Sequence, residues 1–162
     1  MNASETIDAV YAGVKSRLPS ALASTLKFHP AEDSFKFGVH NTGGRILGKQ
    51  AGKIWAGRWC FYSVVVGPDQ HNMSRVGGVG FGCAVNQKPC GAGRHEAALL
   101  EIAGRFCASY PQFHHSTRGK LWLSIATPYC PSTGRDFPVE QAAQDLIALI
   151  EGTFPAIDAL AV

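Results

Sequence analysis

The segment 79–85 limits the possible folds more than any other part of this chain. Its odd positions are apolar, while its even positions and Gly78 carry only glycine or alanine, so the two faces of one period-2 strand differ completely. The apolar face predicts a core strand. The other face is smooth enough for a helix, another backbone or a flat ligand to come close. We expect Gly80 and Gly82 to pack against the helix that follows Gly93.

Three amphipathic helices are predicted around this strand. Apolar residues recur at helical spacing over 7–18 until Pro19, over 99–110, and over 139–150 until Gly152. Proline interrupts a helix and glycine commonly ends one, so we expect the first helix to end at Pro19 and the last at Gly152. A short helical turn over 155–160 follows.

The remaining apolar patterns predict strands. Alternation over 26–29 and 35–39 favours a hairpin. The segment 58–66 is apolar on both faces, which favours a central strand. The segment 121–126 favours a strand parallel to 79–85, because a helix lies between the two. Segments 41–57 and 111–120 are predicted as loops, the first with one helical turn. The fold class expected is α+β: a mostly antiparallel sheet of about five strands, packed by two long helices and an N-terminal helix.

Length and composition predict a single domain over residues 1–162. Hydrophobic residues make up 46% and charged residues 17%, which favours a compact core over disorder. The start of the chain lacks the pattern of a secretory leader, and no apolar run is long enough for a membrane span, so we expect a cytoplasmic protein without membrane contact. The net charge of +3 allows an anionic partner without demanding one.

The five cysteines and six histidines have no spacing typical of a metal centre. No C-x-x-C pair occurs, and the odd number of cysteines does not suggest a disulfide framework. We therefore expect reduced thiols, no metal and no resident cofactor. The pair His114-His115 is interpreted as part of an exposed polar loop.

The turn between Lys88 and Arg94 is a candidate anion site. It joins a predicted strand to a helix N-terminus, where free backbone N–H groups and the helix dipole attract phosphate, and its candidate residues are Lys88, Gly91, Gly93 and Arg94. The pattern basic-x-x-Gly-x-Gly-Arg, after a strand and before an amphipathic helix, resembles the pyrophosphate loop of the GCN5-related acetyltransferases (GNAT family). This resemblance implies an acyl-CoA-dependent N-acyltransferase with acetyl-CoA as cofactor.

The segment 45–58 is a candidate nucleic-acid site. It interleaves basic residues with tryptophan, and basic groups can hold phosphates while an exposed aromatic ring stacks on a base. The candidate residues are Arg45, Lys49, Lys53, Trp55 and Arg58.

Nucleophile and nucleotide motifs such as G-x-S-x-G and the P-loop are missing from the sequence. Few charges and many aromatic residues suit a recognition surface. We therefore expect a small binding domain without a catalytic centre, whose partner is either a protein or a nucleic acid. The acyltransferase is the alternative hypothesis, and the oligomeric state is left open.

Overall fold

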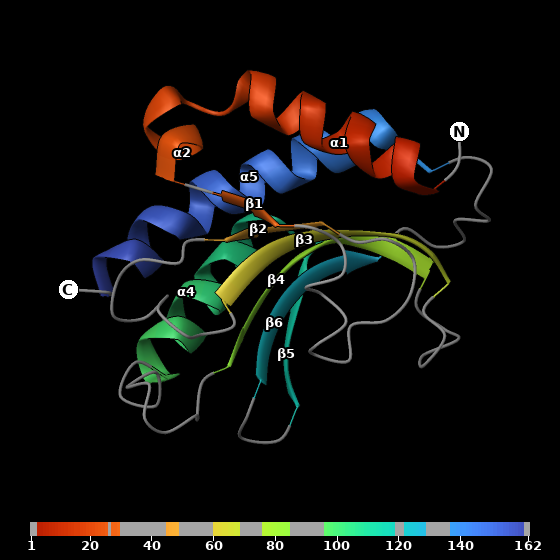
Figure 1. The fold of residues 1–162 in the computed structure, drawn as a ribbon. Helices are drawn as coiled ribbons and strands as arrows, with labels where there is room; N and C mark the ends of the chain where they lie inside the picture. The colour runs from red at the N-terminus through yellow and green to blue at the C-terminus, as the bar shows by residue number, and fades with distance from the viewer. Residues whose placement is uncertain are drawn as a thin grey trace.

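The computed structural model (Figure 1) shows helices packed on an antiparallel sheet. It describes residues 3–25, 27–29, 45–48, 60–68, 76–84, 96–118, 122–128 and 137–160. The elements in chain order are α1 (Ala3–Arg17), α2 (Ser20–Thr25), β1 (Lys27–His29), β2 (Arg45–Gly48), β3 (Cys60–Pro68), β4 (Val76–Ala84), α4 (Glu96–Ser109), β5 (His114–Arg118), β6 (Trp122–Pro128) and α5 (Val139–Leu160).

The described strands form one six-stranded sheet in the order β1-β2-β3-β4-β6-β5. Every neighbouring pair is antiparallel. The longest strands, β3 and β4, lie at the centre, and their register is regular from Cys60/Cys83 to Val65/Gly78 before it shifts towards Pro68. The short strands β1 and β5 form the two edges.

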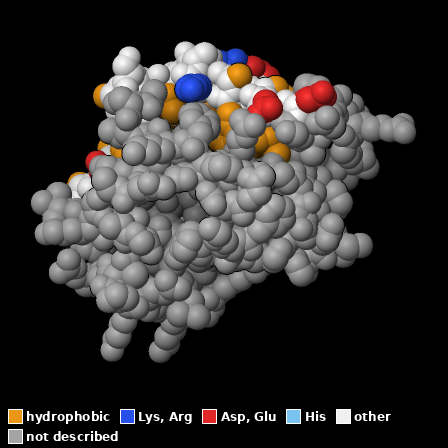
Figure 2. Space-filling view, viewed as in Figure 1, with side chains coloured by type: hydrophobic (Ala, Val, Ile, Leu, Met, Phe, Trp, Pro, Cys, Tyr) orange, Lys and Arg blue, Asp and Glu red, His pale blue; other side chains and the backbone are white. Residues whose placement is uncertain are grey.

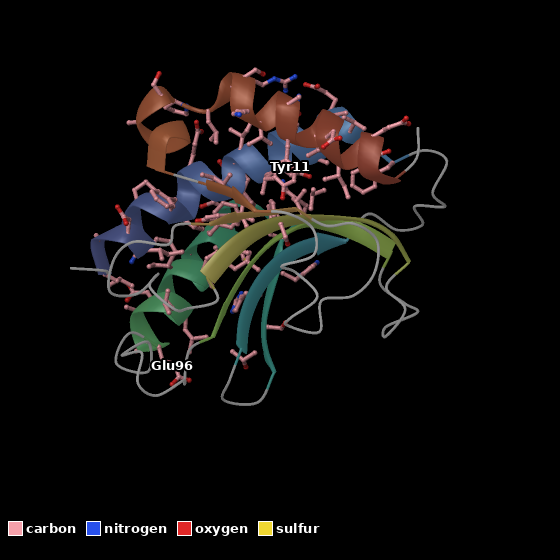
Figure 3. All side chains as sticks on the ribbon, viewed as in Figure 1. Tyr11 and Glu96 are labelled. Carbon is pink, nitrogen blue, oxygen red and sulfur yellow. The ribbon has the colours of Figure 1, made fainter. Side chains whose placement is uncertain are left out.

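The hydrophobic core lies between one face of the sheet and the helices. Tyr62, Phe81 and Ile125 are register partners on three adjacent strands, and all three are buried in one cluster with residues of α1, α4 and α5. Val64 and Val79 form the next buried pair. Figure 1 shows α1 and α5 lying together above the sheet, and Tyr11 of α1 is buried where α1 approaches it (Figure 3).

Small residues allow the helices to approach one another closely. A Cβ atom at Gly13 of α1 would lie 3.2 Å from Cβ of Ala143 in α5. The same pair of helices is joined at the surface by an ion pair between Arg17 and Glu140. The predicted periodicity of the N-terminal helix and of the helix after Gly93 is confirmed by α1 and α4.

The predicted sheet of about five strands is wrong. The sheet has six strands, two of which, β2 and β5, come from segments predicted as loops, and the described residues are more helical than strand. Strand β1 pairs with β2, and the predicted hairpin partner 35–39 lies outside the described residues. Strand β5 is polar and has no apolar alternation. It is a strand because its backbone pairs with β6, and its local sequence pattern does not predict this.

Two predicted arrangements within the sheet are also wrong. Strand β6 is antiparallel to β4, because β5 intervenes between α4 and β6 and the chain reverses once more. The face of β4 that carries Gly80 and Gly82 is not the face that packs against the helices, since Val79 and Phe81 occupy that core. The helix after Gly93 therefore packs on the opposite side from the one expected.

The predicted end of the last helix at Gly152 is wrong as well. Helix α5 continues through Gly152 and Pro155 to Leu160. Phe154 and Ile157, which follow the predicted end, are both buried in the core. Their burial favours the longer helix enough to offset the missing N–H of the proline.

Candidate nucleic-acid interface

The structure describes only one of the sequence-predicted nucleic-acid residues. Arg45 begins β2 and is the register partner of Val64, so its position falls on the sheet face that carries the core. Lys49, Lys53, Trp55 and Arg58 lie outside the described residues. The structure thus describes no cluster around Arg45, and this site stays a prediction.

The predicted anion loop also lies outside the described residues, from Lys88 through Gly91 and Gly93 to Arg94. The helix expected after it is present as α4, which begins at Glu96 (Figure 3). A carboxylate in the first turn already complements the positive end of the helix dipole. The acyl-CoA alternative stays a prediction.

The sheet face away from the helices has a distinctive set of positions. Because strand residues alternate between faces, Gly78, Gly80 and Gly82 of β4 share this face with Ser63 of β3. Gly78 and Gly82 are buried and Gly80 and Ser63 are half-buried. The centre of this face therefore consists largely of small residues.

Basic residues occupy positions at both edges of the same face. The register connects His29 of β1 through Ile46 and Ser63 to Gly80, and places Lys27 two residues before His29 on the same side. At the other edge, His114 is linked through Ala126 to Gly80, and Arg118 through Trp122 to Ala84. We call this the helix-free face, because the described helices pack on the other side of the sheet. It has small residues at its centre and basic positions at its two edges.

Two aromatic residues take positions on this face by the same reasoning. Phe61 is paired with Gly82, and Trp122 is paired with Ala84. The partner of each aromatic position is thus glycine or alanine, the two residues with the smallest side chains. Basic groups and aromatic rings are the side chains that commonly contact single-stranded nucleic acids.

The strands and helix α5 differ in charge. The six strands contain Lys27, Arg45 and Arg118 but no aspartate or glutamate. Helix α5 contains four carboxylates and no lysine or arginine: Glu140, Asp145, Glu151 and Asp158. Helix α1 carries both signs, as the blue and red side chains at the top of Figure 2 show. Among the described elements, the strands are therefore basic and α5 is acidic.

Sequence reasoning missed this difference, although the sequence contains a signal for it. No aspartate or glutamate occurs in 34–68, 70–95 or 102–135, while lysine and arginine occur in all three segments. These segments include five of the six strands. A scan for acid-free segments would have indicated the sheet as the basic part of the fold.

The acidic residues of α5 that are described take part in the fold. The Arg17 guanidinium, which donates a hydrogen bond to Glu140, holds the pKa of that carboxyl below its usual value. Asp145 is buried and accepts hydrogen bonds from the side-chain amides of Gln141 (2.9 Å) and Gln112 (3.4 Å). The two hydrogen bonds to Asp145 explain how a carboxylate is kept beside the core.

A buried hydroxyl pair joins the sheet to α5. The hydroxyl groups of Tyr62 and Thr153 are 2.8 Å apart, and Thr153 donates to the carbonyl of Leu149. Since the threonine hydroxyl has one hydrogen, Tyr62 must be the donor to Thr153. Burial raises the pKa of Tyr62, so it stays protonated, and we assign this pair a structural role.

His114 and His115 are exposed as predicted, although they lie in β5 and not in a loop. Within the described ranges, no three or more His, Cys, Asp or Glu side chains are grouped to hold a metal ion. The described helices also include none that is long and apolar enough to cross a membrane.

Comparison of the chain with protein-family models, curated proteins and solved structures finds no match.

Proposed function

We propose that this protein binds single-stranded nucleic acid on the helix-free face of its sheet. The observation that supports the proposal is the composition of that face, where basic positions at both edges flank a centre of small residues and two aromatic positions. Phosphates carry a charge at every nucleotide, so a ligand that spans the sheet meets basic residues at both edges. Bases, in turn, stack on aromatic rings.

Single strands suit this face better than a duplex. Stacking requires unpaired bases, and single strands offer unstacked bases that can lie on aromatic side chains. A duplex would present only its phosphates, because its bases already stack on each other. We therefore expect tighter binding of a single strand than of a duplex of the same length.

The direct test is fluorescence anisotropy with a labelled 12-nucleotide oligo(dT) strand and the matching duplex, over a series of salt concentrations. The variant Lys27→Ala/Arg118→Ala removes one basic residue from each edge of the face. We expect weaker binding and a smaller salt dependence, by about 0.7 units of log–log slope for each phosphate that the variant no longer neutralises.

The matched control is Lys15→Ala/Arg105→Ala, which removes the same charge from α1 and α4. Both of its residues are exposed on helices. We expect this variant to bind like the wild type apart from a small effect of net charge. Equal losses of affinity in the two double variants, or no binding of the single strand by the wild type at low salt, would contradict the proposal and favour a protein partner.

The aromatic positions have a separate test. We expect Phe61→Leu to weaken binding of the single strand by roughly 1–3 kcal/mol if a base stacks there, while the salt dependence stays as in the wild type. Circular dichroism and thermal unfolding must show that the variant is folded. Unchanged affinity in a folded Phe61→Leu protein would remove this residue from the proposed site.

A further inference from the structure

Cys60 and Cys83 are directly opposite each other in the two central strands. Cys60 begins β3, Cys83 lies near the end of β4, and the register pairs them. The pairing is regular through Phe61/Gly82 and Tyr62/Phe81, so it does not depend on an irregular part of the ladder. Backbone pairing alone thus brings two thiol-bearing residues together from positions far apart in the sequence.

The backbone geometry of such a pair matches that of a disulfide. Directly opposite residues on antiparallel strands have Cα atoms about 4.5–5.5 Å apart. Disulfides join Cα atoms about 4.4–6.8 Å apart. The Cα spacing expected for this pair therefore falls within the range that a disulfide spans.

We propose that Cys60 and Cys83 form a cross-strand disulfide when the protein meets a disulfide oxidant such as oxidised glutathione. One cysteine thiolate attacks the glutathione disulfide and releases a first glutathione thiolate. The second cysteine thiolate then attacks the mixed disulfide and releases the other glutathione. The protein loses two electrons and two protons, and oxidised glutathione is reduced to two thiols.

The remaining cysteines supply the contrast. Cys107 lies in α4, and burial raises its thiol pKa, which lowers its reactivity as a thiolate. Cys90 and Cys130 lie outside the described residues.

A disulfide between Cys60 and Cys83 would close a loop over 60–83 and join the two central strands of the sheet covalently. Closing such a loop restricts the unfolded chain, so the oxidised protein should be more stable than the reduced protein.

Peptide mapping tests the pairing directly. The protein is unfolded in urea and refolded with oxidised and reduced glutathione, so that burial of the thiols in the folded state does not prevent their oxidation. It is then alkylated and digested with trypsin. Cleavage after Arg58 and Arg75 yields peptide 59–75, in which Cys60 is the only cysteine. Peptide 76–94 contains both Cys83 and Cys90, so the measurement is made on the Cys90→Ser variant.

We expect peptides 59–75 and 76–94 to be joined in Cys90→Ser, with a loss of about 2 Da from the intact protein. Oxidation should raise the melting temperature by several degrees, and Cys83→Ser should abolish both effects while Cys107→Ser retains them. Failure to recover the joined peptides after oxidative refolding, or linkage of Cys60 to another cysteine, would overturn the proposal. If the link is confirmed but the reduced and oxidised proteins have the same melting temperature, the stabilising role is refuted.

Discussion

A Cβ atom at Gly152 of α5 would lie 2.7 Å from both Cδ2 and Cε2 of Phe106 in α4. The Phe106 ring is held in place, because it stacks on Tyr110 at 4.7 Å and meets the edge of Phe113 at 5.0 Å. The two helices therefore meet at a glycine against a fixed aromatic ring. This contact explains why a glycine occurs inside a helix, where it is otherwise unfavourable.

We expect Gly152→Ala to destabilise the protein by about 1–3 kcal/mol, since the added methyl group must displace the Phe106 ring. Urea unfolding measures the change. The matched control is Gly104→Ala in α4, where an added Cβ would meet no atom within 4 Å. That variant should be more stable than the wild type by up to about 1 kcal/mol, because alanine favours helix. The same sign for both variants would contradict this account.

The hydrogen bond between Tyr62 and Thr153 predicts unequal costs for removing its two partners. Thr153→Val leaves the buried Tyr62 hydroxyl without its acceptor and should cost about 1–3 kcal/mol. Tyr62→Phe removes the donor, but Thr153 keeps its bond to Leu149, so we expect about 1 kcal/mol. The double variant should lose less than the sum of the two. Thermal unfolding of the three variants provides the comparison, and additive losses would show that the hydroxyl groups are not coupled.

The ion pair between Arg17 and Glu140 predicts a pH-dependent contribution to stability. The pKa of Glu140 in the folded protein is below its usual 4.5, so the pair stabilises the fold above that value and loses its effect as the pH falls through the lowered pKa. We expect Glu140→Gln to have a lower urea midpoint than the wild type at pH 7, with the difference vanishing in acid once Glu140 is protonated in the folded protein. A difference that persists in acid would assign the effect to something other than the charge of Glu140.

Gly78 has a backbone φ of 146°, a conformation that other residues rarely adopt. It lies in β4 opposite Val65, where the register with β3 becomes irregular. We expect Gly78→Ala to destabilise the protein by about 1–3 kcal/mol through backbone strain. D-Alanine introduced at the same position by chemical ligation prefers positive φ and should recover most of the loss in denaturant midpoint. If L-alanine and D-alanine lower the denaturant midpoint equally, the cause is steric crowding by the methyl group and not backbone strain.

Local pattern was sufficient to predict elements whose period is visible in a short segment. The spacing of apolar residues in α1 and α4 and the alternation in β4 could be recognised without knowledge of their neighbours, because each element buries one regular face. The tyrosine at the end of the 99–110 pattern is the exception. Tyr110 follows the last residue of α4 and is partly exposed, stacked on Phe106.

The candidate site was less accessible to sequence reasoning. Lys27, His29, His114 and Arg118 are distant in sequence, and only the order of strands places them at the two edges of one face. The same holds for Cys60 and Cys83, whose pairing depends on the β3–β4 register. The basic and aromatic residues of segment 45–58 are neighbours in sequence, and this is the only kind of proximity that a sequence displays.

The sequence by itself determined where helical and alternating apolar faces occur, because those periods follow from the backbone geometry of each element. Only the tertiary structure decided that α5 continues past Gly152, that β5 is a strand, and which face of β4 is covered by helices. These outcomes depend on contacts with Phe106, with β6 and with the helical layer. The free energy of such long-range burial and pairing outweighs the local preferences of a glycine, a proline or a short polar segment.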